Sequence, residues 1–249
     1  MSEIQTLSEK KTQLFWGLSM FFLTNVILAE VIGPKIFSVD KTFNIALSSG
    51  WFKLDLSAGI LIWPVVFLTT DIINQYFGVQ GVKKITFITF ALLVFVFLMF
   101  RLSTILSPAE FWMQVNSKDA NGNLFDPNHA FAFNINQGSN IIIGSLSAFL
   151  VSQLLDALVY QKIRKMTREK HLWLRATGST FFSQLVDSYF ILFVAFYFLG
   201  NWSLENIFKV GTTQFIFKFL VAIISTPIVY LAHSLIDKYL KGKTTSITA

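Results

Sequence analysis

The sequence predicts an all-α membrane protein with six transmembrane helices. Of its 249 residues, 53% are hydrophobic and only 14% are charged, whereas an average soluble domain is about 25% charged. Its mean hydropathy is +0.58. Apolar stretches near the roughly 20 residues that a spanning helix needs cover residues 14–32, 56–77, 85–106, 139–160, 176–199 and 211–235. We therefore expect residues 1–249 to form a single six-helix transmembrane domain.

The first apolar stretch (14–32) follows a polar tail of about a dozen residues. A secretory signal would have basic residues at its start, a shorter apolar core and a cleavage site of small residues. This stretch is longer and ends at Gly33–Pro34–Lys35, which is typical of a helix end. It is expected to be the first span, although it carries the polar residues Asn25 and Glu30.

The second stretch (56–77) begins like a membrane span and ends unlike one. Its first half is apolar around Trp63–Pro64, where we expect the helix to bend. Burying an amide or a carboxylate without a partner costs on the order of several kcal/mol, so polar groups here should face a protein interior or a water-filled cavity. The polar residues of its second half are Thr69, Thr70, Asp71, Asn74 and Gln75.

The segments between the spans differ in composition. Residues 35–55 are expected to form an external loop with an interfacial piece anchored by Trp51, and residues 78–84 a tight basic turn. The extracytoplasmic loop 108–137 is rich in turn-forming residues, and the sequence leaves open whether it is ordered. A basic connector (161–175) joins the fourth span to the fifth.

The distribution of basic residues predicts the orientation. With the N-terminus inside, thirteen of the 20 basic residues lie in inside segments: Lys10, Lys11, Lys83, Lys84, Lys162, Arg164, Lys165, Arg168, Lys170, Arg175, Lys238, Lys241 and Lys243. The positive-inside rule therefore places both termini in the cytoplasm. The same asymmetry accounts for the net charge of +6, so we expect contact with the lipid bilayer and none with nucleic acid.

The fourth and fifth spans carry the same motif, S-Q-L-x-D, at 152–156 and 183–187. Within each motif the Gln and the Asp are three residues apart, so both side chains lie on one helix face. These pairs are Gln153 with Asp156 and Gln184 with Asp187. The second span offers Asp71 and Asn74 at the same spacing, so three helices each present a carboxylate beside a carboxamide.

Carboxylates accept hydrogen bonds, whereas carboxamides both donate and accept them. Together they match a planar heterocycle with adjacent N–H donors and a carbonyl acceptor, of which a guanine-like edge is one example. Trp63, Tyr76, Phe181 and Tyr189 are candidates to stack on its face. Alternatively, the polar groups only join helices, as is common in membrane bundles; their recurrence on three helices favours a site.

Besides the aspartates and Arg101, which lies near the end of the third span, two charged residues lie within the spans. Glu30 is either a proton-coupling residue or a partner for a neighbouring side chain. Lys218 either reaches towards the membrane surface or neutralises one of the acids. Pro227 is expected to kink the sixth span. The candidate substrate-binding residues are therefore Asp71, Asn74, Gln153, Asp156, Gln184, Asp187, Trp63 and Lys218, with Glu30 as a possible coupling residue.

The motifs also carry a family resemblance. W-P-x-x-F-x-x-T-D-I-I-N-[EQ]-Y-x-G at 63–78, G-S-x-x-A-F-L-x-S-Q-x-x-D at 144–156, S-T-x-x-S-Q-x-x-D at 179–187 and a K…T-P-x-x-Y pattern at 218–230 resemble the queuosine precursor transporter family. The first span fits that family too. The resemblance implies a multi-pass inner (plasma) membrane protein that imports 7-deazapurines, such as 7-cyano-7-deazaguanine or 7-aminomethyl-7-deazaguanine. Gln75 departs from it, because the family usually has Glu there.

Three classes of function remain at this point. The first is a carrier working alone or as a homodimer. The second is the substrate-capture subunit of an ATP-driven vitamin uptake system, or an importer of another small heterocyclic compound; the sequence contains no P-loop, so a partner would supply the ATPase. The third is an intramembrane enzyme, which we do not expect. No catalytic residue, cofactor or metal site is expected, since the three histidines are scattered.

Overall fold

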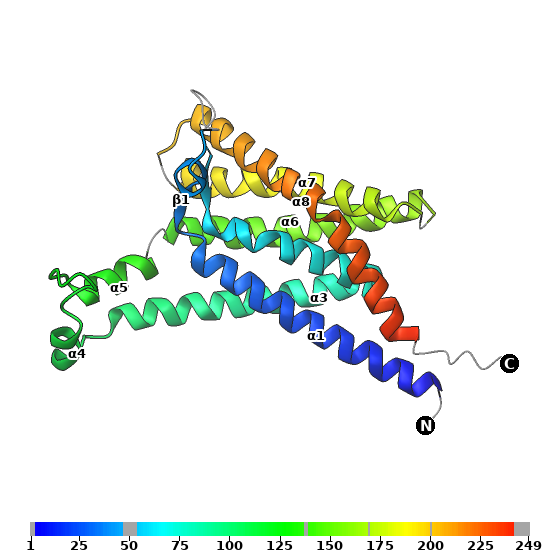
Figure 1. Ribbon diagram of the computed structural model, residues 1–249, viewed down its shortest axis with the longest axis horizontal. Helices are drawn as coiled ribbons and strands as arrows, with labels where there is room; N and C mark the ends of the chain where they lie inside the picture. The colour runs from blue at the N-terminus through cyan, green and yellow to red at the C-terminus, as the bar shows by residue number, and fades with distance from the viewer. Residues whose placement is uncertain (1–2, 47–53, 137–138, 169, 200, 242–249) are drawn as a thin grey trace.

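The computed structural model describes residues 3–46, 54–136, 139–168, 170–199 and 201–241. It is almost wholly helical (Figure 1). The long helices are α1 (Glu3–Ile32), α3 (Trp63–Ile105), α6 (Ser139–Met166), α7 (Leu172–Leu192) and α8 (Leu204–Lys241), and α7 continues into the π-helix η2 (Phe193–Phe198).

Helices long and apolar enough to cross a membrane confirm the predicted class, an all-α membrane protein. Within the described residues there are four: Thr6–Ile32, Trp63–Ile105, Leu172–Phe198 and Leu204–Leu240. The predicted fourth span (139–160) lies within the helix α6, which is not among these four. Exposed apolar side chains on the helix surfaces, such as Met20, Phe95 and Ile224, fit contact with lipid.

The helix α3 contains most of the second predicted stretch and nearly all of the third. It is divided at Gly78, whose φ of 67° and ψ of −175° are not helical, and Figure 1 shows the ribbon turning back within α3. A positive φ favours glycine because glycine has no Cβ. The predicted turn over 78–84 is too long, because the helix resumes directly after Gly78 and runs to Ile105.

The start predicted for the second span at residue 56 is wrong. The strand β2 (Asp55–Ser57) pairs antiparallel with β1 (Ile36–Ser38), and a 3₁₀ turn, η1 (Ala58–Leu61), follows. The helix begins only at Trp63, with Pro64 in its first turn. Proline is favoured there because the first helical N–H groups have no intrahelical acceptor. Trp63–Pro64 thus starts the helix, and the predicted bend within it is absent.

The loops at the β1–β2 end are partly helical. The helix α2 (Val39–Phe43) follows β1, and the proposed anchor Trp51 lies outside the described residues. The segment 108–137 contains α4 (Glu110–Val115) and α5 (Pro127–Asn136). Between them the carboxylate of Asp119 accepts hydrogen bonds from the backbone N–H groups of Asn121 and Asn123. Most of this segment is therefore ordered.

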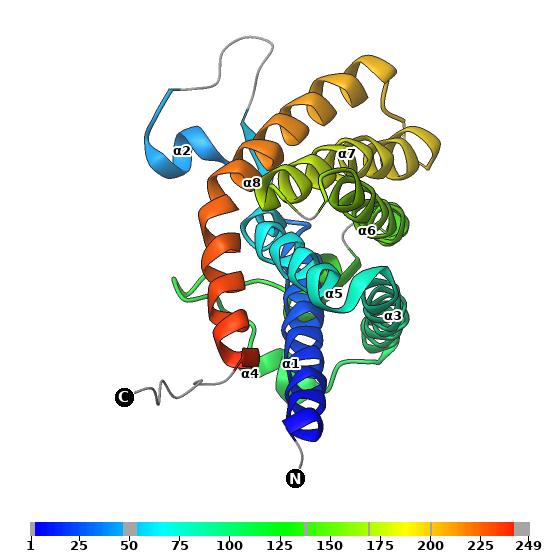
Figure 2. The ribbon, with the colours of Figure 1, turned by 90° about the vertical axis from the view of Figure 1, so that its right-hand side faces the viewer.

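The helices pack around α6 and α3. The helix α6 lies against α7 on one side and α3 on the other, while α8 packs against α7. Phe22, Ile73 and Phe149 belong to one buried apolar cluster that joins α1, α3 and α6. The start of α1 and the end of α8 lie at the end opposite β1, α4 and α5 (Figure 1), and Figure 2 shows α8 changing direction along its length. This helix contains Pro227.

Candidate functional site

The polar residues that the sequence singled out on α3, α6 and α7 are buried inside the helical bundle. Each exposes at most 8% of its surface: Asp71, Asn74, Gln153, Asp156, Gln184 and Asp187. The two S-Q-L-x-D motifs face each other, because Ser183 donates a hydrogen bond to Asp156 (3.0 Å) and Ser152 to Asp187 (3.4 Å). The repeated motif therefore joins α6 to α7 as well as placing its amides in the interior.

A cavity of about 680 Å³, here called the wide cavity, extends from the β1–β2 end into the bundle. Its mouth includes the exposed residues Ile36 and Asp55, and its inner part reaches Asp187 and Lys218. The ammonium of Lys218 lies 2.7 Å from Asp187 Oδ2. The side chain of Lys218 thus neutralises one of the acids, which was one of the two roles considered for it.

Glu30 faces the wide cavity from α1. Its carboxylate accepts a hydrogen bond from Ser145 Oγ on α6 at 2.6 Å. Glu30 is 8% exposed and Ser145 is 9% exposed. The carboxyl group thus lies at the boundary between the cavity and the buried interface of α1 with α6. A change of its charge would alter both the electrostatic potential in the cavity and the contact between the two helices.

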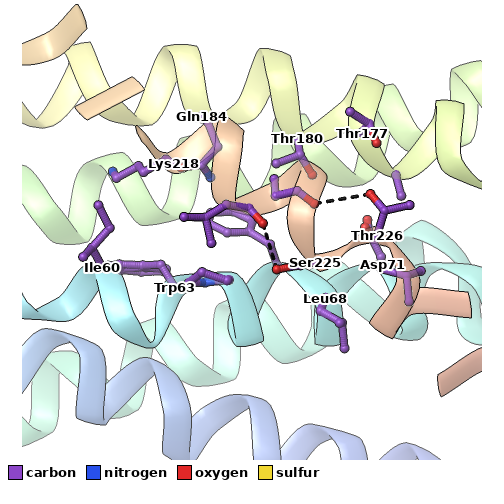
Figure 3. A pocket seen from close by; sticks show the side chains of 16 residues that line it. Ile60, Trp63, Leu68, Asp71, Thr177, Thr180, Gln184, Lys218, Ser225 and Thr226 are labelled. Atoms are coloured by element: carbon purple, nitrogen blue, oxygen red, sulfur yellow. Dashed lines mark hydrogen bonds between the residues drawn. The ribbon is translucent and has the colours of Figure 1, made fainter. Parts of the chain in front are cut away.

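A second, smaller space continues inward from the wide cavity; we call it the narrow pocket (Figure 3). The two share Ile60, Trp63 and Lys218. Its volume of about 30 Å³ exceeds the roughly 10–15 Å³ that a cavity needs to hold one water. The side chains that carry its polar groups are Asp71 on α3, Thr177, Thr180 and Gln184 on α7, and Lys218, Ser225 and Thr226 on α8.

The narrow pocket combines flat apolar surface with unsatisfied polar atoms. Trp63 and Phe67 form an apolar wall, with ring centroids 5.8 Å apart. Gln184 Nε2, Gln184 Oε1 and Asp71 Oδ1 are buried, and none has a hydrogen-bond partner in the described part of the chain. Buried polar groups are normally paired, so these atoms are available to water or to a ligand.

The other predicted polar residues lie beside the narrow pocket and do not line it. Gln153 Oε1 accepts a hydrogen bond from Thr70 at 2.9 Å. The side chain of Asn74 donates to Ala157 O (3.0 Å), and its Oδ1 accepts from Gln161 (2.7 Å). In this conformation the amide of Asn74 therefore serves the packing of α3 against α6.

The predicted aromatic residues separate into two groups. Trp63 lines both the wide cavity and the narrow pocket. Phe181 packs on Phe215 and Phe219, and the hydroxyl of Tyr189 lies 2.8 Å from Thr212 Oγ1. The structure therefore brings Trp63 to the candidate site and leaves Phe181 and Tyr189 in contacts between α7 and α8.

Hydrogen bonds close the bundle between the narrow pocket and the end that carries the termini. Tyr76 on α3 donates to Asp237 Oδ1 on α8 at 2.7 Å, and its ring lies 5.4 Å from that of His233. Arg164 on α6 donates to the backbone carbonyl of Gln75 at 3.2 Å. The wide cavity thus opens towards one end of the molecule, while α3, α6 and α8 are joined at the other.

Sequence reasoning missed one buried charge. The position of Arg175 in the basic connector 161–175 predicts an exposed residue, yet it is only 4% exposed. It stands in the first turn of α7, next to the pocket residues Ala176 and Thr177. The sequence offered one signal: Arg175 lies at i−4 and i−8 from Ser179 and Ser183, on the face that packs against α6.

No group of three or more His, Asp or Glu side chains in the described residues could hold a metal ion. Some oxygens of the buried carboxylates instead bond to hydroxyl groups or to Lys218. Others, such as Asp71 Oδ1, have no hydrogen-bond partner among the described residues. The arrangement is therefore suited to hydrogen bonding of a small polar molecule.

Comparison with known proteins links this chain to transport. Residues 57–232 match the family described as "Putative vitamin uptake transporter". The chain is 29% identical to the "Probable queuosine precursor transporter" of Bacillus subtilis strain 168, over 74% of this chain and 75% of that protein. It is 25% identical to the protein of the same name in Haemophilus influenzae, over 87% of this chain and 84% of that protein. Its identity to the "Queuosine precursor transporter" of Escherichia coli K12 is 23% over the same shares. No solved structure matches.

Proposed function

Because this chain belongs to the vitamin uptake transporter family, a family of membrane transporters, we propose that it imports 7-deazapurine precursors of queuosine into the cytoplasm. The proposed cargo is 7-cyano-7-deazaguanine or 7-aminomethyl-7-deazaguanine, and the proposed location is the inner (plasma) membrane. The three relatives named for queuosine precursor transport support this choice of cargo. The proposed topology has six spans and both termini in the cytoplasm. In it, α3 crosses the membrane once before Gly78 and once after it.

The observation that carries the proposal is the set of unpaired polar atoms in the narrow pocket. Asp71 Oδ1 is an acceptor for the adjacent N–H groups of a guanine-like edge, and the amide of Gln184 offers a donor for its carbonyl. The indole of Trp63 provides a flat surface on which the bicyclic ring can stack. These three groups come from α3 and α7.

The size of the two spaces suggests the order of events. The wide cavity, at about 680 Å³, has ample room for a bicyclic heterocycle, whereas the narrow pocket in this conformation, at about 30 Å³, has room only for water. The cargo would therefore enter the wide cavity first and reach Trp63 and the Lys218–Asp187 pair. It could occupy the narrow pocket only after α8 has moved away from α7.

The joined end would keep this state from leaking. The bonds from Tyr76 to Asp237 and from Arg164 to Gln75 O hold α3 against α8 and α6 beyond the pocket. Release on that side would require these bonds to break while the wide cavity closes. This is the alternation expected of a carrier that exposes one central site to each side in turn.

The charged groups in and around the path favour coupling to protons through Glu30. The buried carboxyl groups Glu30, Asp71, Asp156 and Asp187 outnumber the buried cations Lys218 and Arg175. Intramembrane carboxylates of this kind mark proton relays in other transporters. Glu30 faces the wide cavity, and its hydrogen-bond partner within the described residues is the hydroxyl group of Ser145, which makes it the proposed coupling residue.

The deciding experiment uses a host that cannot make queuosine precursors. Expression of this chain alone, with one candidate precursor supplied at a time, is expected to restore queuosine in tRNA. Lack of restoration with each precursor would contradict the proposal. Restoration only when an ATPase is co-expressed would instead support a substrate-capture subunit.

A further inference from the structure

Gln214 is a polar residue of the wide cavity to which transport, as proposed above, assigns no role. It lies on α8, is partly buried and lines the wide cavity. Its carboxamide makes no hydrogen bond to another residue in the described part of the chain. Because a carboxamide both donates and accepts hydrogen bonds, Gln214 is free to bind a ligand in this cavity.

The helix α8 presents one face to both spaces of the candidate site. Gln214 and Lys218 line the wide cavity, and Lys218, Ala222 and Ser225 line the narrow pocket. Successive residues of this set are four, four and three positions apart, which places them on one helix face. The helix begins at the end of the molecule that carries β1 (Figure 1). Gln214 therefore lies one turn nearer that end than Lys218, about 6 Å along the same face.

The ion pair between α7 and α8 stands between two carboxamides. Lys218 lies 2.7 Å from Asp187. Gln184, three residues before Asp187 on α7, lines the narrow pocket, and its amide is buried without a hydrogen-bond partner in the described residues. One unpaired carboxamide thus lies on each side of the pair, that of Gln214 in the wide cavity and that of Gln184 in the narrow pocket.

The sizes of the two spaces show where a flat molecule can be held in this conformation. The wide cavity measures about 680 Å³ and the narrow pocket about 30 Å³. A bicyclic heterocycle must therefore be held in the wide cavity before α8 moves. Trp63 and Lys218 line both spaces, so they lie where the two meet. A ring stacked on Trp63 is close to Gln214 on one side and to Gln184 on the other.

We propose that Gln214 is a specificity-determining residue of an outer binding position in the wide cavity. There its carboxamide pairs with the lactam edge of a planar heterocycle stacked on Trp63: Nε2 donates to the ring carbonyl, and Oε1 accepts from the adjacent ring N–H. The heterocycle then passes the Lys218–Asp187 pair and exchanges Gln214 for Gln184. The inference rests on the proposed function for the identity of the heterocycle.

The first test uses protection of an introduced cysteine, because the sequence contains none. Val210→Cys places a thiol in the lining of the wide cavity, one turn beyond Gln214. Saturating 7-cyano-7-deazaguanine should slow its labelling by a maleimide several-fold. Adding Gln214→Leu should raise the concentration for half-protection about tenfold, because a hydrogen-bonded edge loses its partner. Lys118→Cys, exposed between α4 and α5, is the control and should show no protection.

The second test closes the narrow pocket. Ala222→Leu adds apolar volume to its lining, which confines a ligand to the wide cavity. In this background Gln214→Leu should weaken binding of the labelled precursor to purified protein about tenfold. Gln184→Leu, the matched change beyond the ion pair, and Gln80→Leu, at an exposed position of α3, should leave the affinity unchanged.

Two results of the second test would overturn the inference. Equal weakening by Gln214→Leu and Gln184→Leu would show that both amides contact one position. Loss of all binding in an Ala222→Leu protein that melts near the wild-type temperature would confine the cargo to the narrow pocket. The protection test leaves the narrow pocket unaltered, so it decides the question even if Ala222→Leu does not fold.

The outcomes also separate this inference from the proposed function, because protection measures occupancy and uptake measures transport. Uptake by the wild type without protection of Val210→Cys would overturn the inference alone. Protection that Gln214→Leu removes, without uptake by the wild type, would uphold the outer position and refute the proposed transport. Neither protection nor uptake with either precursor would refute both.

Discussion

Ser183 on α7 donates a hydrogen bond to Asp156 on α6 across 3.0 Å. The reciprocal pair, Ser152 on α6 with Asp187 on α7, is 3.4 Å apart. The Ser and Asp of each S-Q-L-x-D motif thus join the two helices, while the amide of Gln184 remains unpaired in the narrow pocket. Both interpretations of the five-residue motif therefore apply, each to different residues. The Ser and Asp make the helix contact, and Gln184 belongs to the candidate binding site.

Asp187→Asn is expected to abolish uptake while the protein still inserts. The substitution leaves the ammonium of Lys218 buried without its carboxylate at 2.7 Å, and breaking a buried pair on one side costs about 3–5 kcal/mol. Initial rates of precursor uptake and the amount of protein in the membrane give the comparison. The double variant Asp187→Asn with Lys218→Met should recover stability without uptake. Undiminished uptake by Asp187→Asn would remove Asp187 from the site.

Gln184→Leu is expected to raise the KM for precursor uptake by about 10- to 100-fold. The substitution keeps the side-chain size but removes a donor and an acceptor, and losing a hydrogen bond to a buried group costs about 1–3 kcal/mol. Gln80→Leu, at an exposed position of α3, is the matched control. Equal KM values for the two variants would show that Gln184 does not contact the cargo.

Glu30→Gln is expected to uncouple uptake from the proton gradient. The amide can still bond Ser145, which lies 2.6 Å from Glu30 Oε2, but it cannot gain or lose a proton. Net accumulation should therefore fall, while exchange of labelled for unlabelled precursor across the membrane continues. A protonophore should lower accumulation in the wild type and have little effect on the variant. Accumulation by the variant that still collapses with the protonophore would place coupling elsewhere.

Single cysteines provide a direct test of topology, because the sequence contains no cysteine. Lys118→Cys, in the segment between α4 and α5, and Lys165→Cys, at the end of α6, are both exposed. A membrane-impermeant maleimide added to intact cells should label the first and not the second. Labelling of the second before lysis would reverse the proposed orientation.

The sequence by itself determined the class of the protein and the helices that carry its polar residues. Apolar stretches of about 20 residues are long enough to cross a bilayer, and Gln and Asp three residues apart must share a helix face. Both conclusions depend only on local spacing. The structure buries Gln153, Asp156, Gln184 and Asp187, as expected for polar side chains on helices that face lipid on their other sides.

Only the tertiary structure decided which of these side chains is free to bind. Asn74 and Gln184 look equivalent in the sequence, yet α6 pairs with the amide of Asn74 and leaves that of Gln184 unpaired. Arg175 looks like its basic neighbours, yet α7 turns it into the bundle. The partner of a buried polar group depends on how each helix is rotated against its neighbours. That rotation is set by packing across the whole bundle, which local spacing does not encode.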